Sequence, residues 1–186
     1  MNKSLSVLFL VLVAAITPAG ATIITLQAPA TPNGSFDVPV NATGVFDPPH
    51  NTDFLLAYGF NITFDPSILA YLGESPGPLF DDLSGQPGIG AQVAGVATAI
   101  VLGPGDFTEP LTLAVLHFGL TGLGSTSISI SGDPANLDQG LFYLTGSDAI
   151  SASVELTAIP EPSAAWLLGL GVLAVWAMRV SRRRNA

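Results

Sequence analysis

The feature that most constrains the fold of this chain is an alternation of apolar and small polar side chains. It recurs in four segments, at residues 35–40, 56–65, 125–131 and 150–156. In the third segment, for example, serines alternate with Thr126, Ile128 and Ile130. A period of two residues is typical of β-strands that have one face in a core and the other in water.

Three further apolar segments, 22–26, 92–102 and 111–120, are also expected to be strands, and turn-forming residues separate all of these segments. Residues 65–69 predict one short helical turn with Pro66 at its first position. Asp65 is interpreted as a turn residue whose carboxylate accepts hydrogen bonds from the backbone N–H groups that follow it. The sequence therefore predicts an all-β fold, an antiparallel jelly-roll or immunoglobulin-like sandwich of about seven to nine strands.

The N-terminus has the form of a secretory signal peptide. Lys3 precedes an apolar run over residues 5–16, and Ala19 and Ala21 form a small-x-small cleavage site. We therefore predict a signal peptide over residues 1–21, with cleavage after Ala21. The alternative is an uncleaved membrane anchor, for which the apolar run is short.

The C-terminus combines three features in a fixed order. They are the tripeptide Pro160-Glu161-Pro162, an uncharged apolar stretch over residues 164–178, and the basic residues Arg179, Arg182, Arg183 and Arg184. The apolar stretch predicts a transmembrane helix, because it has no polar face that could turn to water. The positive-inside rule places the arginines in the cytoplasm, and hence the preceding domain outside the inner membrane.

This arrangement resembles the PEP-CTERM sorting signal of Gram-negative bacteria that produce exopolysaccharide. The resemblance implies that a membrane-embedded protease of the exosortase type reads Pro160, Glu161 and Pro162. It also implies that the helix and the arginines hold the precursor in the inner membrane until the protein is processed. The expected organisation is a signal peptide at 1–21, a β-sandwich at 22–158 and a sorting signal at 159–186, with the mature form at the cell surface or secreted.

A second resemblance rests on residues 35–41, 56–72 and 111–130. These segments are similar to the cohesin, or carbohydrate-binding-module-like, jelly-roll sandwich. The most specific part is F-D-P-S-x-L-x-Y, from Phe64 to Tyr71. The resemblance implies the fold, but it does not imply dockerin binding, because the contact residues of that interface cannot be matched in this sequence.

The charge distribution excludes several functions. Every Lys and Arg lies in the two terminal segments, so residues 22–158 contain thirteen acidic residues, no basic ones, and a formal charge of −13. Nucleic-acid binding is excluded, because phosphates require clustered Lys and Arg. A domain of this charge favours divalent cations and basic or neutral partners over acidic polysaccharide. The absence of cysteine excludes disulfides, zinc–thiolate sites and cysteine nucleophiles.

We predict no enzyme, no catalytic residues and no bound organic cofactor. His50 follows a Pro-Pro turn and His117 lies in an expected strand. The two are far apart in the sequence, and each is interpreted as a surface loop or strand residue rather than part of a site. A glycosidase would require two facing carboxylates. The candidates for that role are Asp81, Asp82, Asp106 and Glu109, for which a solvated acidic surface is the simpler interpretation.

One loop is a candidate calcium site, with oxygen ligands from Asp133, Asn136 and Asp138. The spacing is not that of an EF-hand, and the alternative is a turn rich in Asp and Asn.

We expect an exported, non-enzymatic surface or extracellular-matrix protein that acts in adhesion, biofilm formation or exopolysaccharide association. The alternative is a carbohydrate- or protein-binding module at the cell envelope, with or without calcium. Its partners would be the sorting protease, the inner membrane, and a polysaccharide or another surface protein. Aromatic residues outside the expected core strands could stack on sugars. They are Phe46, Phe54, Tyr71, Phe80 and Phe107.

Overall fold

The computed structural model describes residues 22–159, apart from 100 and 137, and all regular elements in this part are β-strands. The eleven strands are β1 (Ile23–Leu26), β2 (Ser35–Thr43), β3 (Leu55–Thr63), β4 (Leu69–Pro76), β5 (Phe80–Asp82), β6 (Val93–Ala97), β7 (Leu111–Leu120), β8 (Gly124–Gly132), β9 (Gly140–Tyr143), β10 (Ser147–Asp148) and β11 (Ile150–Ala158). This exceeds the predicted seven to nine, because strands as short as β5 and β10 show no alternation. The predicted signal peptide and transmembrane helix lie outside the described residues. No helix within these residues has the length and apolar character needed to cross a membrane.

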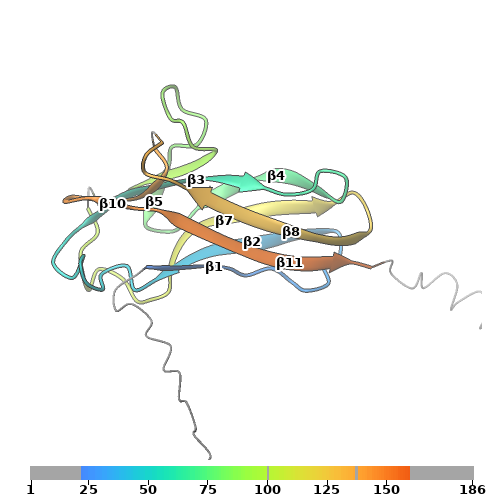
Figure 1. Cartoon of the computed structure of the whole chain (residues 1–186), viewed down its shortest axis with the longest axis horizontal. Coiled ribbons are helices and arrows are strands. Elements are labelled where there is room, and N and C mark those ends of the chain that lie inside the picture. Colours follow the sequence, from blue (N-terminus) through green and yellow to red (C-terminus); the bar gives the residue numbers. More distant parts are fainter. Residues whose placement is uncertain (1–21, 100, 137, 160–186) are drawn as a thin grey trace, which may run out of the picture.

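The strands form two antiparallel sheets that face each other, which confirms the predicted β-sandwich (Figure 1). One sheet has the order β1-β2-β7-β4. The other is built around β3, which pairs with β6 on one side and with β8 and β9 on the other. The sheet then extends through β5 next to β6, β11 next to β8, and β10 next to β9.

The core lies between the sheets and is filled by the apolar residues of the alternating strands. Phe118 of β7 and Phe60 of β3 are completely buried, as is Ile128 of β8. At the start of β3 the predicted alternation of inward and outward residues is wrong, because Leu55 is buried and Leu56 is only partly buried. The register against β9 shifts between Leu55 and Ala57, and this bulge moves the inward position by one residue.

The expected strand at 92–102 is shorter than predicted, since β6 ends at Ala97 and Leu102 makes only an isolated bridge to Leu55. The expected helical turn at 65–69 is present as a single turn, in which the backbone N–H of Leu69 donates to the carbonyl of Asp65 at 2.9 Å. The Asp65 carboxylate accepts from the backbone N–H of Ser67 at 2.8 Å and from its hydroxyl at 2.7 Å, which confirms the predicted turn role. These bonds from Ser67 hold the pKa of Asp65 below its usual value.

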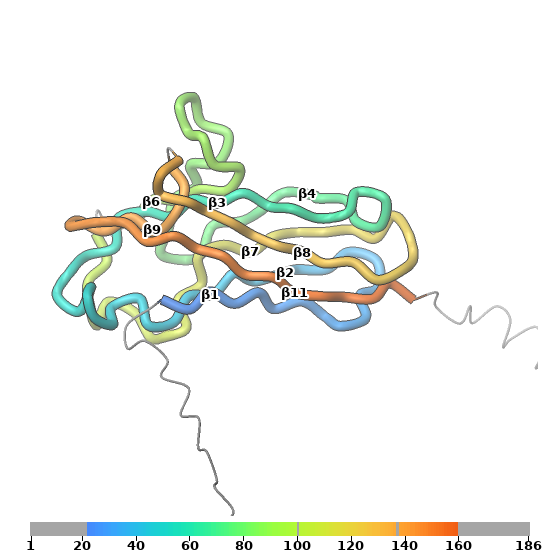
Figure 2. The backbone as a smooth tube through the Cα atoms, viewed as in Figure 1, coloured from blue at the N-terminus to red at the C-terminus, as the bar shows by residue number. Residues whose placement is uncertain are grey.

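The two ends of the described chain lie at opposite ends of the sandwich (Figure 2). β1 begins beside the loop between β2 and β3, where the Thr22 hydroxyl is 3.4 Å from the carbonyl of Gly44. β11 ends at the other end of the sandwich, far from that loop. The loop between β5 and β6, green in Figure 2, projects from the side of the sandwich.

Candidate functional site

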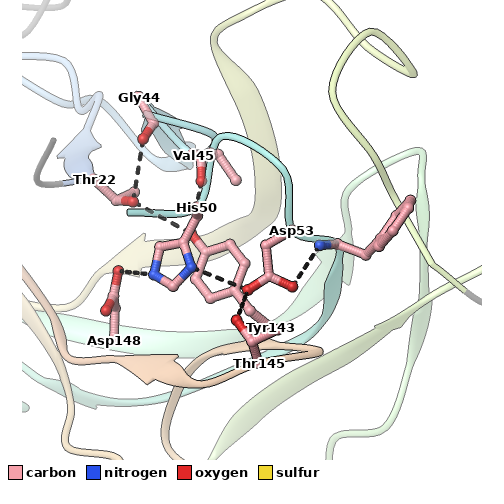
Figure 3. Close-up of polar contacts among 9 residues, drawn as sticks. Thr22, Gly44, Val45, His50, Asp53, Tyr143, Thr145 and Asp148 are labelled. Atoms are coloured by element: carbon pink, nitrogen blue, oxygen red, sulfur yellow. Dashed lines mark hydrogen bonds and ion pairs between the residues drawn. The ribbon is translucent and has the colours of Figure 1, made fainter. Parts of the chain in front are cut away.

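A buried polar network surrounds His50 at the end of the sandwich where β1 begins (Figure 3). His50 lies in a loop, as predicted, but it is only 7% exposed, so its predicted surface position was wrong. Its Nδ1 lies 3.2 Å from Asp53 Oδ2 and its Nε2 lies 3.1 Å from Asp148 Oδ2. Its ring stacks on Tyr143, with 3.7 Å between centroids and 5° between planes. The sequence did not reveal the network, because Asp148 is 98 residues away from His50.

The same network fixes the neighbouring loop to β9. The Tyr143 hydroxyl donates to the carbonyl of Val45 at 3.0 Å, and burial raises the pKa of Tyr143 to about 12. Asp53 accepts from the Phe54 N–H at 2.8 Å and from the Thr145 hydroxyl. Burial opposes ionisation of Asp53, but the bonds from Thr145, Phe54 and His50 outweigh it and lower its pKa. Since a carboxylate faces each His50 nitrogen, the network serves to hold the loop in place.

A second polar row crosses the outer face of the four-stranded sheet. His117 of β7 lies opposite Asp37 of β2, and its Nδ1 is 2.8 Å from Asp37 Oδ1. On its other side, His117 Nε2 is 3.0 Å from the hydroxyl of Ser75, which belongs to β4. The predicted strand position of His117 is confirmed, but the sequence did not indicate either partner. Each of the three residues occupies an outward position in its strand. The register of the strands then brings the three side chains together.

The outer face of the other sheet is covered by small polar side chains. We call this surface the hydroxyl face. Its residues lie opposite one another in the registers of β3 with β8 and of β8 with β11. They are Asn61 and Thr63 of β3, Ser125, Ser127, Ser129 and Ser131 of β8, and Ser151, Ser153, Glu155 and Thr157 of β11. The hydroxyls of Ser129 and Ser153 are 2.9 Å apart. Those of Ser125 and Thr157 are 3.2 Å apart. A shallow hollow of about 310 Å³ lies along this end of β8 and β11.

The predicted calcium residues make separate backbone contacts. Asp133 Oδ1 accepts from the N–H of Ala135 at 2.9 Å, whereas Asp138 Oδ2 accepts from the N–H of Gly90 at 3.2 Å. The first contact is the Asp turn that was the alternative. Among the described residues, no group of three His, Asp or Glu side chains is placed to hold a metal ion. Asn136 is not a residue of that kind, and calcium binding at this loop stays a prediction.

The carboxylates considered for a glycosidase are dispersed. Asp106 accepts from the N–H of Gly103 at 2.6 Å, and Glu109 accepts from the N–H of Gly44 at 3.0 Å. Asp81 and Asp82 lie on β5 and are exposed. Asp106 therefore stabilises its own turn, and Glu109 stabilises the loop between β2 and β3.

The aromatic candidates do not form one sugar-stacking surface. Phe80 was wrongly placed outside the core, since it is 4% exposed and packs edge-on against Tyr58. Phe46 and Phe107 pack on each other with their centroids 5.7 Å apart. Tyr71 packs on Phe118, and Phe54 is 39% exposed.

The architecture defines a cohesin-like β-sandwich, as predicted. The cohesin module of a family 33 glycoside hydrolase from Clostridium perfringens matches it with a TM-score of 0.51 and 8% identity, over 75% of this chain and 96% of that chain. A type II cohesin–X-dockerin complex with an interface mutation, from Acetivibrio cellulolyticus, matches with a TM-score of 0.44 and 14% identity. This match covers 75% of this chain and 100% of that chain. No curated protein sequence matches this chain.

The C-terminus supplies the more specific finding. Residues 158–184 match the PEP-CTERM protein-sorting motif, which confirms the resemblance seen in the sequence. The chain is therefore a cohesin-like β-sandwich followed by a PEP-CTERM sorting signal. The motif indicates an exported protein that an exosortase-type system sorts to the cell envelope.

Proposed function

We propose that this protein is a module of the cell envelope that associates with exopolysaccharide through its hydroxyl face. The observation that supports this most directly is the hydroxyl face itself. Nine of its ten side chains are uncharged Ser, Thr or Asn, and Glu155 is the exception. Such side chains can both donate and accept hydrogen bonds, as sugar hydroxyls do.

The spacing of the hydroxyl face suits an extended polymer. Neighbouring strands are about 4.8 Å apart, and successive outward residues of one strand are about 6.7 Å apart. Each hydrogen bond that replaces one to water stabilises by only about 1 kcal/mol. Tight association therefore requires many contacts along one chain, as in multivalent binding. The charge of residues 22–158 repels acidic polymers, so the ligand is a neutral polysaccharide or a neutral stretch of one.

The binding proposal is tested by electrophoresis of the protein through gels that contain neutral or acidic polysaccharides. Ser129→Val with Ser153→Val removes two paired hydroxyls and keeps side chains that suit a strand. Thr25→Val makes a similar change on an exposed position of β1, in the other sheet. We expect neutral polymer to retard the wild type and Thr25→Val, but not the double variant. Equal migration of all three proteins, or retardation by acidic polymer alone, contradicts the proposal.

We also propose that the two parts of the C-terminus have separate roles in sorting. Pro160, Glu161 and Pro162 are read by the protease, because two prolines favour an extended backbone that a protease can bind. A membrane helix at 164–178 and the four arginines hold the precursor in the inner membrane. The mass of the mature protein is compared in cells with and without the sorting protease. A mature protein that begins at Thr22 and has lost the arginines supports the proposal, and one that retains them refutes it.

Protein binding is the second candidate function, and the likeness of fold to a cohesin module favours it. Fold alone is weak support for a function. The same hydroxyl-face variants separate the two candidates in a pull-down from envelope extracts treated with polysaccharide-degrading enzymes. Retention of a protein that survives this treatment and is lost in the double variant favours protein binding. Repeating the experiment with a calcium chelator tests calcium dependence.

A further inference from the structure

The row formed by Ser75, His117 and Asp37 supports a further activity, which is distinct from the proposed binding function. We propose that Ser75 is a nucleophile, activated by His117 and Asp37, that accepts acyl groups from esters. The three residues come from β4, β7 and β2, on the outer face of the four-stranded sheet. The hydroxyl face belongs to the other sheet, so the two surfaces are separate.

The contacts suit one arrangement of protons, in which the ring of His117 can act as a base. An ionised carboxylate can only accept hydrogen bonds, so Nδ1 of His117 donates its proton to Asp37 Oδ1 across 2.8 Å. Nε2 of the neutral ring then carries a lone pair, which accepts the proton of the Ser75 hydroxyl across 3.0 Å. This is the order of atoms by which serine hydrolases activate their nucleophile, and it is recognised by geometry rather than by sequence position. His50 differs, because carboxylates face both of its nitrogens.

The surroundings of Ser75 leave room for a reacting ester. β4 is the outermost strand of its sheet, Ser75 is exposed, and the side chain of His117 is 34% exposed. An outermost strand offers backbone N–H groups that no neighbouring strand uses, and such groups can stabilise an oxyanion. This open position suits an ester carried on a small molecule or on a polymer, rather than one that needs a deep pocket.

Apolar side chains flank the row and can contact the acyl group. Val115 of β7 lies opposite both Ser75 and Pro39, on the same outer face. On the other side of His117, Leu72 is 59% exposed and lies over Gly119, where an added Cβ would be 3.5 Å from its Cδ1. The register shift between Tyr71 and Gly73 leaves Leu72 without a partner on β7.

The proposed reaction has two balanced steps. The Ser75 oxygen attacks the ester carbonyl carbon, its proton passes to His117 Nε2, and a new C–O bond forms. The bond to the leaving alcohol then breaks, and that alcohol takes the proton from Nε2. Water releases the acyl group as an acid by the same route in reverse, with His117 again as the base. Asp37 acts as a positioning residue, because it orients the ring and does not touch the substrate.

The test uses the full chain, a fluorophosphonate probe and p-nitrophenyl acetate as the ester. Peptides are mapped after chymotrypsin digestion, since no Lys or Arg lies between Lys3 and Arg179 for trypsin. We expect the probe on Ser75 and a burst of nitrophenolate in the wild type. Ser35, an exposed serine on the same face without a histidine contact, is the internal reference, and Ser35→Ala keeps the wild-type rate.

His117→Gln and Asp37→Asn keep the serine and remove its activation. We expect labelling of Ser75 to slow about 100-fold in His117→Gln, the lower part of the range for general-base catalysis. Asp37→Asn is expected to reduce the rate as well, with the melting temperature of both variants within about 2 °C of the wild type, because both positions are on the surface. The proposal is overturned if Ser75 is labelled no faster than Ser35, or if His117→Gln labels at the wild-type rate while it remains folded.

Discussion

Replacing Tyr143 by Phe tests whether the buried network at one end of the sandwich stabilises the domain. Tyr143 is 4% exposed, and its hydroxyl donates to the carbonyl of Val45, which is completely buried. The Phe ring keeps the stacking on His50 and removes only the hydroxyl. The carbonyl of Val45 then has no donor from this side chain, whereas Thr22 keeps its contact with Gly44.

The magnitude follows from that unpaired carbonyl. A buried acceptor that loses its partner costs about 1–3 kcal/mol, so we expect the free energy of unfolding to fall by about 2 kcal/mol. For a domain of roughly 140 residues, an unfolding entropy of about 2.1 cal/mol/K per residue gives about 0.3 kcal/mol/K. The melting temperature is therefore expected to fall by about 7 °C.

Calorimetry and urea unfolding measure this change, with Tyr71→Phe as the matched control. Tyr71 is half-buried and donates to Glu74, and water can replace it there, so we expect a loss below about 0.5 kcal/mol. The reasoning is refuted if Tyr143→Phe destabilises the domain no more than Tyr71→Phe does.

The same variant has a signature at high pH. Folding raises the pKa of Tyr143 from 10.0 to about 12, chiefly because burial disfavours the phenolate. The resulting stability is complete below pH 10 and is lost as the pH rises through about 12. Tyr143→Phe lacks this contribution, so its stability should fall less steeply over that window. If the stability of the two proteins falls in parallel over this pH range, the pKa assignment is contradicted.

Three further predictions concern stability and are measured by urea unfolding. The folded protein lowers the pKa of Asp53, so the ionised carboxylate stabilises the fold. This stability is present above the ordinary carboxyl pKa of about 3.9 and is lost as the pH falls through the lowered value. Asp53→Asn should therefore make stability depend less on pH in that range. Gly59→Ala should cost about 1–3 kcal/mol or more because a Cβ there overlaps the backbone oxygen of Asp138, while Gly146→Ala, with open space around it, should cost less than about 1 kcal/mol. Leu116→Ala should cost about 3 kcal/mol as a fully buried residue, and Leu144→Ala, at 63% exposure, less than about 0.5 kcal/mol.

The sequence predicted the fold class because the alternation directly reports which face of a strand is buried. Ile128 and Ile130 are inward as expected, and the serines that alternate with them lie on the outer face. The phase failed at Leu56, because a bulge depends on the pairing of β3 with β9 and leaves no local signal. The sorting motif at residues 158–184 could be predicted from the sequence, because it is read as a continuous stretch and does not depend on tertiary contacts.

The candidate sites were harder to predict, because they depend on register. His117 could be placed on a strand, but its neighbours are 42 and 80 residues away from it. A shift of one residue in either pairing would turn Ser75 or Asp37 to the other face. The burial of His50 had the same origin, since Asp148 reaches it from β10, a strand of two residues.

The end of β11 has a consequence for the order of events during export. The last strand continues to Ala158, which pairs with Gly124, and the sorting motif begins at the same residue. Pro160 can therefore lie no more than about 7 Å along the chain from the folded edge. A protease that binds the chain in a groove needs several free residues on each side of its target. Brief opening of the last pairs of β11, an event far less costly than global unfolding, would supply them. If the sorting protease acts as proposed above, the rate of processing would then report how often the last pairs of the β8–β11 ladder open.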